Sequence, residues 1–279
     1  GRSMVRRRAG LRLWLSAGWL GLLCIAALLA PWIAPKDPLA QDLFLGRMPP
    51  VWEMGAEPGY WLGTDSLGRD VLSRIIHGAR IALMVALIAG TITCVIGATL
   101  GLLAGFLRGW VDLVISRLID IWMAFPPVLF SILLIAVIGP GLISIIIAIV
   151  VIDWTRFARV VRAEAMAQGA MDYVASAQVA GRKRLSTMVT EILPNVLPTI
   201  VVLLTLEMGI AVIVEAILSF VNLSISTDDP TWGGMISEGR TSIHQAWWVL
   251  VFPLINKKTL VVGPSTVSQE KILLRLPSS

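Results

Sequence analysis

The sequence predicts an all-α polytopic membrane protein with five clear transmembrane helices and a degenerate sixth. The chain is 56% hydrophobic and only 15% charged, and its mean hydropathy is +0.81. Soluble domains carry about 25% charged residues, whereas about 20 apolar residues in a helix cross a bilayer. We divide the chain into a cytoplasmic N-terminal segment (1–12), a membrane domain (13–255) and an atypical C-terminal tail (256–279).

The first predicted span, residues 13–35, is uncharged and follows a cluster of three arginines, Arg6 to Arg8. A cleaved signal peptide would have an apolar region of only about 7–15 residues, so a retained span is predicted. Residues 1–3 precede Met4 and resemble a remnant of cloning, and they are left out of the fold argument.

Four further spans follow in the sequence. They are predicted at about residues 81–107, 113–138, 142–161 and 192–222. Basic residues gather around Arg108 and in the loop 156–184, whereas the loops 36–80 and 224–245 carry mixed charge. Because arginine and lysine favour the cytoplasmic side, the N-terminus and both basic segments are predicted inside, and the mixed loops outside.

The last apolar run, residues 246–255, is too short to complete a sixth span. Ten residues of helix cover about 15 Å, and each lysine near the bilayer centre would cost about 2.5–3.5 kcal/mol. Asn256, Lys257 and Lys258 follow at once. We therefore predict that residues from about Leu254 onward are not the ancestral ending, come from a frameshift or from added sequence, and are irregular.

Composition and motifs exclude several classes of function. A net charge of +5 is explained by arginines in cytoplasmic loops, so no nucleic acid partner is expected. Cys24 and Cys94 lie in apolar spans, which leaves no disulfide framework and no cysteine metal site. His77 and His244 are isolated. The chain has no HExxH, no nucleophile elbow and no nucleotide-binding fingerprint, so we expect neither an enzyme active site nor a cofactor or metal in it.

The stretch WLGTDSLGRDVLSR, residues 61–74, is unusually polar for this chain. It lacks the lysine of a phosphate loop, and Asp65 and Asp70 are not spaced as calcium ligands, because Leu67 stands where a ligand would be needed. The pattern predicts an extracytoplasmic turn that leads into a short amphipathic helix. Val71, Leu72, Ile75 and Ile76 would line its apolar side, with Arg69, Ser73, Arg74 and His77 facing water or headgroups.

Ionisable residues in or near the spans are candidates for the translocation path. They are Arg117, Asp120, Asp153, Glu207 and Glu215. Such groups are costly in lipid and normally face a partner or a water-filled path. Glu207 lies about 21 Å beyond Leu193 along a helix, too deep for an interfacial position. Both an interhelical contact and a wet path remain open for it.

The cytoplasmic segment 172–195 predicts a short helix followed by the next span. Asp172 would cap it, Tyr173 and Ala177 would share a face with Ala180, and Gly181 would end it before a basic run that starts at Arg182. Leu193-Pro194 would begin the next span, with proline in its first turn. The short helix has the shape of one that inserts into a partner's groove, and a merely interfacial helix is the alternative.

Five motifs together resemble one family, the inner-membrane permeases of bacterial ABC importers for dipeptides, oligopeptides and nickel. The cytoplasmic loop is similar to the family's EAA motif, with Ala175-Ser176-Ala177, Gly181 and Ile192-Leu193-Pro194 in the corresponding places. Ala175 replaces the usual glutamate, so an acidic contact is not expected there. The other four motifs are WLGTDSLGRDVLSR, RLIDIWMAFP, EAILSF and PTWGGMISEGR, and the set covers most of residues 60–253.

The resemblance implies a type I ABC importer permease in the bacterial inner membrane, crossing it several times. It implies a heterodimer with a homologous permease, two cytoplasmic ATPases that carry the ATP and Mg²⁺, and a periplasmic substrate-binding protein. The implied ATPase-coupling residues are Asp172, Tyr173, Ala177, Gly181 and Arg182. The implied docking residues for the binding protein, which would also brace the mouth of the pore, are Gly63, Asp65, Gly68, Arg69, Asp70, Trp232 and Gly233.

Peptides are the expected cargo, since two histidines and scattered methionines give no nickel-ligand set. An importer for nickel or another small solute is the nearest alternative. A proton-coupled secondary transporter that uses Glu207 or Asp153 would leave the short cytoplasmic helix unexplained, and no inverted repeat is visible. A membrane scaffold without transport would leave the buried charges unexplained.

Overall fold

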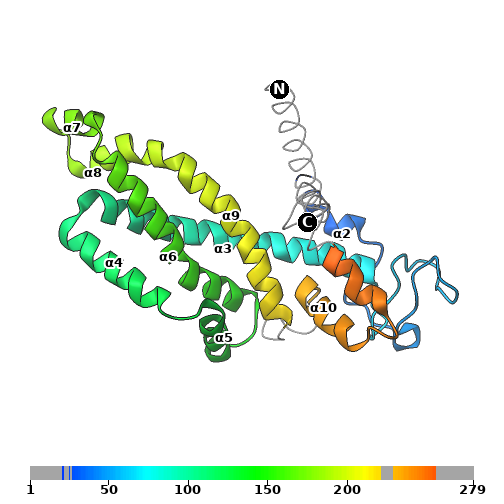
Figure 1. The fold of residues 1–279 in the computed structure, drawn as a ribbon. Helices are drawn as coiled ribbons and strands as arrows, with labels where there is room; N and C mark the ends of the chain where they lie inside the picture. The colour runs from blue at the N-terminus through cyan, green and yellow to red at the C-terminus, as the bar shows by residue number, and fades with distance from the viewer. Residues whose placement is uncertain (1–20, 22–24, 26, 221–228, 256–279) are drawn as a thin grey trace, which may run out of the picture. The chain divides into compact units, whose positions relative to one another are not determined.

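The computed structural model describes Gly21, Ile25 and residues 27–220 and 229–255 (Figure 1). Most of the first predicted span, the end of the fifth span and the tail 256–279 lie outside the described residues. Within the described part the chain is helical, and its one β contact is an isolated antiparallel bridge between Thr64 and Asp70. The all-α prediction is confirmed for these residues.

The chain divides into two compact units. One unit comprises residues 1–84 with 215–279, and the other comprises residues 85–214. Two long helices, α3 (Val71–Leu107) and α9 (Leu193–Phe220), supply residues to both units.

Helix α3 joins two elements that the sequence pattern separated. The predicted short amphipathic helix after Asp70 and the predicted span 81–107 are one continuous helix of 37 residues. No proline interrupts residues 71–107, so nothing in the covalent chain ends the first helix before the second begins.

The predicted third span, 113–138, is wrong as a single helix. It is divided into α4 (Gly109–Met123) and α5 (Pro127–Ile138), whose axes differ by 86°. Pro126 has an extended backbone and is followed directly by Pro127 at the first position of α5. A proline disfavours helical backbone in the residue before it and cannot donate to the helix ladder, so two in succession end one helix and start another.

Helix α6 (Leu142–Gln168) runs seven residues beyond the predicted end of the fourth span and packs closely on α3. Gly97, Gly101 and Gly105 of α3 allow this approach. A Cβ atom would lie 2.4 Å from the Phe157 Cβ at Gly97, and 2.7 Å from the Ala158 carbonyl oxygen at Gly101. The glycine spacing predicted close packing of this helix against another helix, and that helix is α6.

The core of the second unit lies between α3, α6 and the helices after α6. Those helices are α7 (Asp172–Val179), α8 (Arg184–Thr187), a π-helical turn η2 (Met188–Ile192) and α9. Cys94 and Ala98 of α3 pack with Phe157 and Val161 of α6, and Val174 of α7 joins the same cluster.

The helical run that contains α9 begins earlier than predicted, at Arg184 rather than near Ile192. Pro194 was expected in the first turn of the span, and it lies inside this run. It has no N–H for the carbonyl of Thr190, and the π-helical turn η2 directly precedes α9. A wider turn of this kind accommodates the missing hydrogen bond.

The first unit consists of shorter pieces around the start of α3. They are α2 (Ala30–Ile33), the 3₁₀ turn η1 (Leu43–Leu45), α10 (Trp232–Thr241) and helical residues 247–255. Val71 and Ile75 pack there with Met235 of α10 and with Trp248 and Val249.

Fewer membrane-spanning helices are found than the sequence predicted. Among the described residues, α3 and the run Arg184–Phe220 are each long and apolar enough to cross a membrane, and the bent pair α4 and α5 would make a third if counted as one span. Helix α6 falls short because Asp153, Arg156 and Arg159 interrupt its apolar sequence. The first span lies mainly outside the described residues, as does whatever follows Ile255.

Candidate functional site

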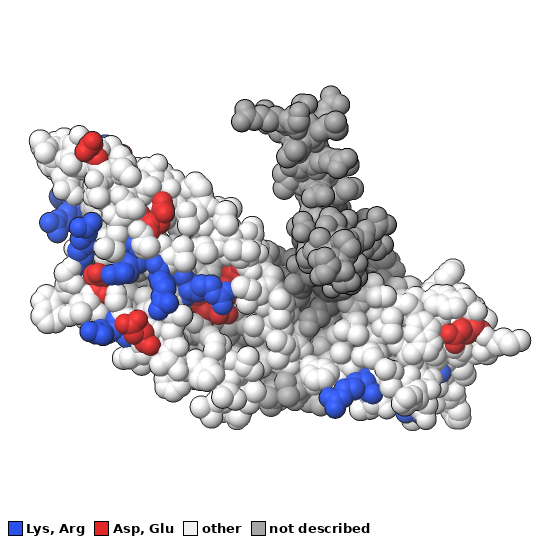
Figure 2. All heavy atoms as spheres, in the orientation of Figure 1, with Lys and Arg blue, Asp and Glu red and all other residues white. Residues whose placement is uncertain are grey.

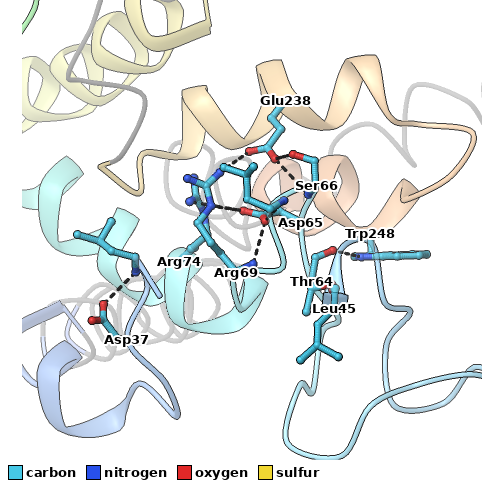
Figure 3. A network of polar contacts seen from close by, with 11 residues as sticks. Asp37, Leu45, Thr64, Asp65, Ser66, Arg69, Arg74, Glu238 and Trp248 are labelled. Carbon is cyan, nitrogen blue, oxygen red and sulfur yellow. Dashed lines mark hydrogen bonds and ion pairs between the residues drawn. The ribbon is translucent and has the colours of Figure 1, made fainter. Parts of the chain in front are cut away.

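Asp65 is the hub of a buried polar network in the first unit (Figure 3). Its Oδ1 accepts hydrogen bonds from the backbone N–H groups of Leu67 and Arg69, each at 2.9 Å. Its Oδ2 accepts from Arg69 Nε at 2.6 Å and lies 3.5 Å from Arg74 Nη1. Since the side chains of Asp65, Arg69 and Arg74 are all buried, this network requires mutual pairing of its charges.

Glu238 connects α10 to this network. Its Oε2 accepts from Arg69 Nη2 at 3.0 Å, and its Oε1 accepts from Ser66 Oγ at 2.5 Å (Figure 3). Sequence analysis quoted the motif that contains Glu238 but did not select the residue, because its partners Ser66 and Arg69 lie about 170 positions earlier. No local pattern signals a contact of that range.

Asp70 caps the N-terminus of α3. Its Oδ2 accepts from Ser73 N at 2.8 Å and from Ser73 Oγ at 2.5 Å, and the Ser73 hydroxyl accepts from Lys36 N at 3.0 Å. The expectation that Arg69, Ser73 and Arg74 face water is therefore wrong. These polar side chains turn inward, toward the carboxylates of Asp65 and Asp70.

The seven residues assigned to docking of a binding protein are all buried. Trp232 donates from Nε1 to the Ile75 carbonyl at 3.0 Å. At Gly233 a Cβ would lie 2.4 Å from the Ala216 carbonyl oxygen, and at Gly63 it would lie 2.5 Å from the Met48 carbonyl oxygen. All seven are buried in this structure: five lie in the loop before α3, and Trp232 and Gly233 begin α10, which packs against the start of α3.

Charged residues of α6 form a row of ion pairs in the second unit. Arg156 bonds to Asp153 Oδ1 at 2.9 Å and to Glu207 Oε2 of α9 at 3.0 Å. Arg159 lies 3.8 Å from Asp120 of α4.

Arg162 forms a bidentate ion pair with Asp112 of α4, in which Arg162 Nη2 lies 2.8 Å from Asp112 Oδ2. Figure 2 shows basic and acidic side chains gathered together over the part of the surface that α4 and α6 occupy in Figure 1.

Three of the four acids predicted for the path or for interhelical contact come together here. Asp120, Asp153 and Glu207 each face an arginine of α6. Glu215 does not join them, since it belongs to the first unit, where it accepts a hydrogen bond from Ser219 at 2.6 Å. Glu207 is buried and its second oxygen, Oε1, has no hydrogen-bond partner among the described residues.

Helix α7 is held by one buried side chain and exposes most of the rest. Val174 is buried in the core of the second unit. The Tyr173 hydroxyl donates to Gln168 at 2.8 Å, and Arg182 pairs with Glu191 at 2.5 Å. Val179 at the end of α7 is 90% exposed.

Two details of the predicted short helix are corrected and one is confirmed. Asp172 is the first helical residue and not the cap, since Met171 is in the cap position and no side chain caps the helix. Ala177 is half-buried and Ala180 is exposed, so the face that Tyr173, Ala177 and Ala180 were predicted to share is only partly exposed to solvent. Gly181 does follow the helix in the left-handed conformation, with φ of 79°, as a C-terminal glycine should.

The fold has a counterpart among solved structures. The structure resembles a chain of the MetNI methionine ABC transporter in an inward-facing conformation, with a TM-score of 0.57 and 18% identity over 73% of this chain and 97% of that one. At this identity the likeness concerns the fold alone.

Sequence comparison establishes the family. Residues 97–256 match the family described as "binding-protein-dependent transport system inner membrane component". This protein belongs to that family, whose members are transport components of the inner membrane and not catalysts.

Relatives with known names are similar over most of their length. A di/tripeptide permease, DppC, of Pseudomonas aeruginosa is 40% identical over 83% of this chain and 77% of its own length. A dipeptide permease of Haemophilus influenzae is 38% identical over 87% and 82%, respectively. A glutathione permease, GsiD, of Shigella dysenteriae is 37% identical over 84% and 76%.

Proposed function

We propose that this chain is one of two permease subunits that form the pore of an ATP-driven importer, and that its cargo is di- or oligopeptides. The proposal rests on the relatives, whose names specify dipeptide, di/tripeptide or glutathione transport at 37–40% identity. Glutathione is itself a tripeptide, so these names share one chemical class of substrate. The second pore subunit would be a homologous permease.

The proposed topology has five spans and an incomplete sixth in a bacterial inner membrane, with the N-terminus inside. Helix α6 would cross despite its charges. Asp153 and Arg156 pair with each other, and Arg156 also pairs with Glu207, so the cost of placing them at membrane depth is reduced. Most of the first span lies outside the described residues.

The proposed contact with the ATPases is α7 with the loop that follows it. The exposed side chains of Val179 and Lys183 support this role, because a partner's groove could contact them; Arg182, which pairs with Glu191, is exposed beside them. ATP and Mg²⁺ would be bound by the ATPase chains, and this chain would hold neither.

The proposed contact with the binding protein is the loop before α3. The buried residues around Asp65 would hold this loop rigid, and side chains on its outer surface would make the contact. Phe44 and Met54 are almost fully exposed there. Exposed aromatic residues and methionine are enriched at protein interfaces.

Uptake in cells tests the function. The chain would be expressed with its companion permease, ATPases and binding protein in a bacterial strain that lacks peptide importers, and uptake of radiolabelled dipeptide would be measured. We expect uptake that stops when ATP is depleted and persists when a protonophore is added. Uptake that follows the proton gradient, or transport of nickel without transport of peptide, would overturn the proposal.

A further inference from the structure

Helix α7 packs against the π-helical turn η2, which directly precedes α9 (Figure 1). Val174, the buried residue of α7, belongs to the same apolar cluster as Met188 and Ile192 of η2. Two polar connections join the same parts of the chain, one at the start of α7 and one just after its end. Helix α7 is therefore attached to the beginning of the α9 span at three points.

The first polar connection runs through the side-chain amide of Asn195 in α9. Its Nδ2 donates to the Glu191 carbonyl of η2 at 2.7 Å and to the Tyr173 hydroxyl of α7 at 3.3 Å. The Tyr173 hydroxyl donates in turn to Gln168, the last residue of α6, at 2.8 Å. One amide group thus bonds both to the backbone of the π-helical turn and to α7.

The second polar connection runs through Arg182, which follows α7. Its Nη1 lies 2.5 Å from Glu191 Oε1 and donates to Thr190 Oγ1 at 2.8 Å. Glu191 and Thr190 both belong to η2. Because Arg182 is 49% and Glu191 31% exposed, this ion pair contributes little to the stability of the fold. It fixes the position of the chain after α7 relative to the turn.

The backbone of η2 differs from that of an ordinary helix. The Leu193 N–H bonds to the Met188 carbonyl, one residue further back than in an α-helix, and Pro194 has no N–H to donate. Single π-helical turns are rare and occur mostly at functional sites. Since the Asn195 amide bonds to a carbonyl of this turn and also to Tyr173, a displacement of α7 acts directly on the turn.

We propose that η2 is the joint that transmits movement of α7 to α9, and that Asn195 and Glu191 are the positioning residues that hold α7 to this joint. The inference rests on the proposed function, in which α7 meets the ATPases. Movement of α7 on its partner would be carried through both polar connections into the first turns of α9. Without these connections, α7 would be held by Val174 alone and the movement would be absorbed in the loop.

Removing the amide tests the first connection. Leucine in Asn195→Leu is similar in size and has no donor. Thr205→Val is the matched control, since the Thr205 hydroxyl bonds within its own helix to the Val202 carbonyl. The complete importer is reconstituted in liposomes, and dipeptide uptake per ATP hydrolysed is measured. We expect Asn195→Leu to lower this ratio about fivefold or more, as for loss of a typical coupling between two sites. ATP hydrolysis without the binding protein and the amount of copurified ATPase should be unchanged.

Reversing a charge tests the second connection. Glu191→Lys places two cations opposite each other at Arg182 and should lower uptake per ATP to a similar extent. Glu191→Gln retains an oxygen that accepts from Arg182 and should restore most of the coupling. Ser186→Lys is the control, because it adds a cation at an exposed position earlier in the same helical run and should leave the ratio unchanged.

Two results would overturn the inference. One is normal uptake per ATP in both Asn195→Leu and Glu191→Lys. The other is a loss of copurified ATPase and of melting temperature that parallels the loss of uptake, because the residues would then only maintain the fold. Failure of the unaltered importer to take up any dipeptide would refute the proposed function itself, and is distinguished by the absence of uptake before any substitution.

Discussion

At the scale of single residues, the loop before α3 is held by ion pairs and hydrogen bonds between buried charged groups. Asp65 accepts hydrogen bonds from two backbone N–H groups and forms ion pairs with two arginines. Glu238 accepts hydrogen bonds from Arg69 and Ser66. Removing one partner from a buried charged group costs about 3–5 kcal/mol, because the other is left uncompensated. The loop is therefore sensitive to any change that moves Asp65 from this position.

Gly68 is one such position. Its φ is +75°, and a Cβ there would lie 1.8 Å from the carbonyl oxygen of Asp42. Gly68→Ala should lower the apparent melting temperature in detergent by about 5–10 °C, since the strained backbone costs about 1–3 kcal/mol before the clash is counted. Gly55→Ala is the control, with φ of +91° and nothing within 4 Å of the added carbon. Equal shifts for the two variants would show that the contact with Asp42 is unimportant.

At the scale of elements, α6 connects the parts of the second unit. One side of α6 packs on the glycines of α3, and the arginines of α6 pair with carboxylates of α4 and α9. Helix α7 is attached to this assembly through Val174, which packs in the same core. A force applied to α7 by a partner would therefore act on the core between α3, α6 and α9.

Val179 is the position at which that role of α7 can be tested without disturbing the fold. Its side chain is 90% exposed, whereas Gly181 has a φ of +79° that would strain any replacement. Val179→Asp should reduce ATP-driven uptake at least tenfold and weaken copurification of the ATPases, because a charge would be buried in their groove. Met54→Asp, at a fully exposed position in the loop before α3, should retain the ATPases. Normal uptake in Val179→Asp would rule out the docking role.

At the scale of the whole molecule, the orientation in the membrane follows from the placement of arginine. Basic residues occupy the segments around Arg108 and residues 156–184, so we predict that α7 lies on the cytoplasmic side and the loop before α3 outside.

Cysteine labelling tests the orientation. In a variant without Cys24 and Cys94, Met54→Cys should react with an impermeant maleimide added to intact cells, and Val179→Cys should react only after the membrane is opened. Both positions are exposed, whereas Ser66 is half-buried and donates to Glu238 and so makes a poor labelling site. The opposite pattern would reverse the topology and place the loop before α3 on the ATPase side.

The sequence by itself determined the helical class, the membrane environment and the family motifs, because hydrophobic runs and local spacing depend only on neighbouring residues. It also located the short helix before Gly181 and the close packing of the α3 glycines. It placed Arg69, Ser73 and Arg74 in water, since a helical pattern contains no information on carboxylates that arrive from elsewhere. It treated α4 and α5 as one span because their hydropathy is continuous across Pro126 and Pro127.

Only the tertiary structure decided which charges meet. Glu238 reaches Arg69 across 169 positions and Glu207 reaches Arg156 across 51, and no rule of spacing connects residues so far apart. An apolar pocket at the bend between α4 and α5 likewise forms only because the fold places Ile152 of α6 near Trp122 and Phe130. These contacts form because burial in a shared core brings distant segments together. A buried charge is stable there only when an opposite charge is buried beside it.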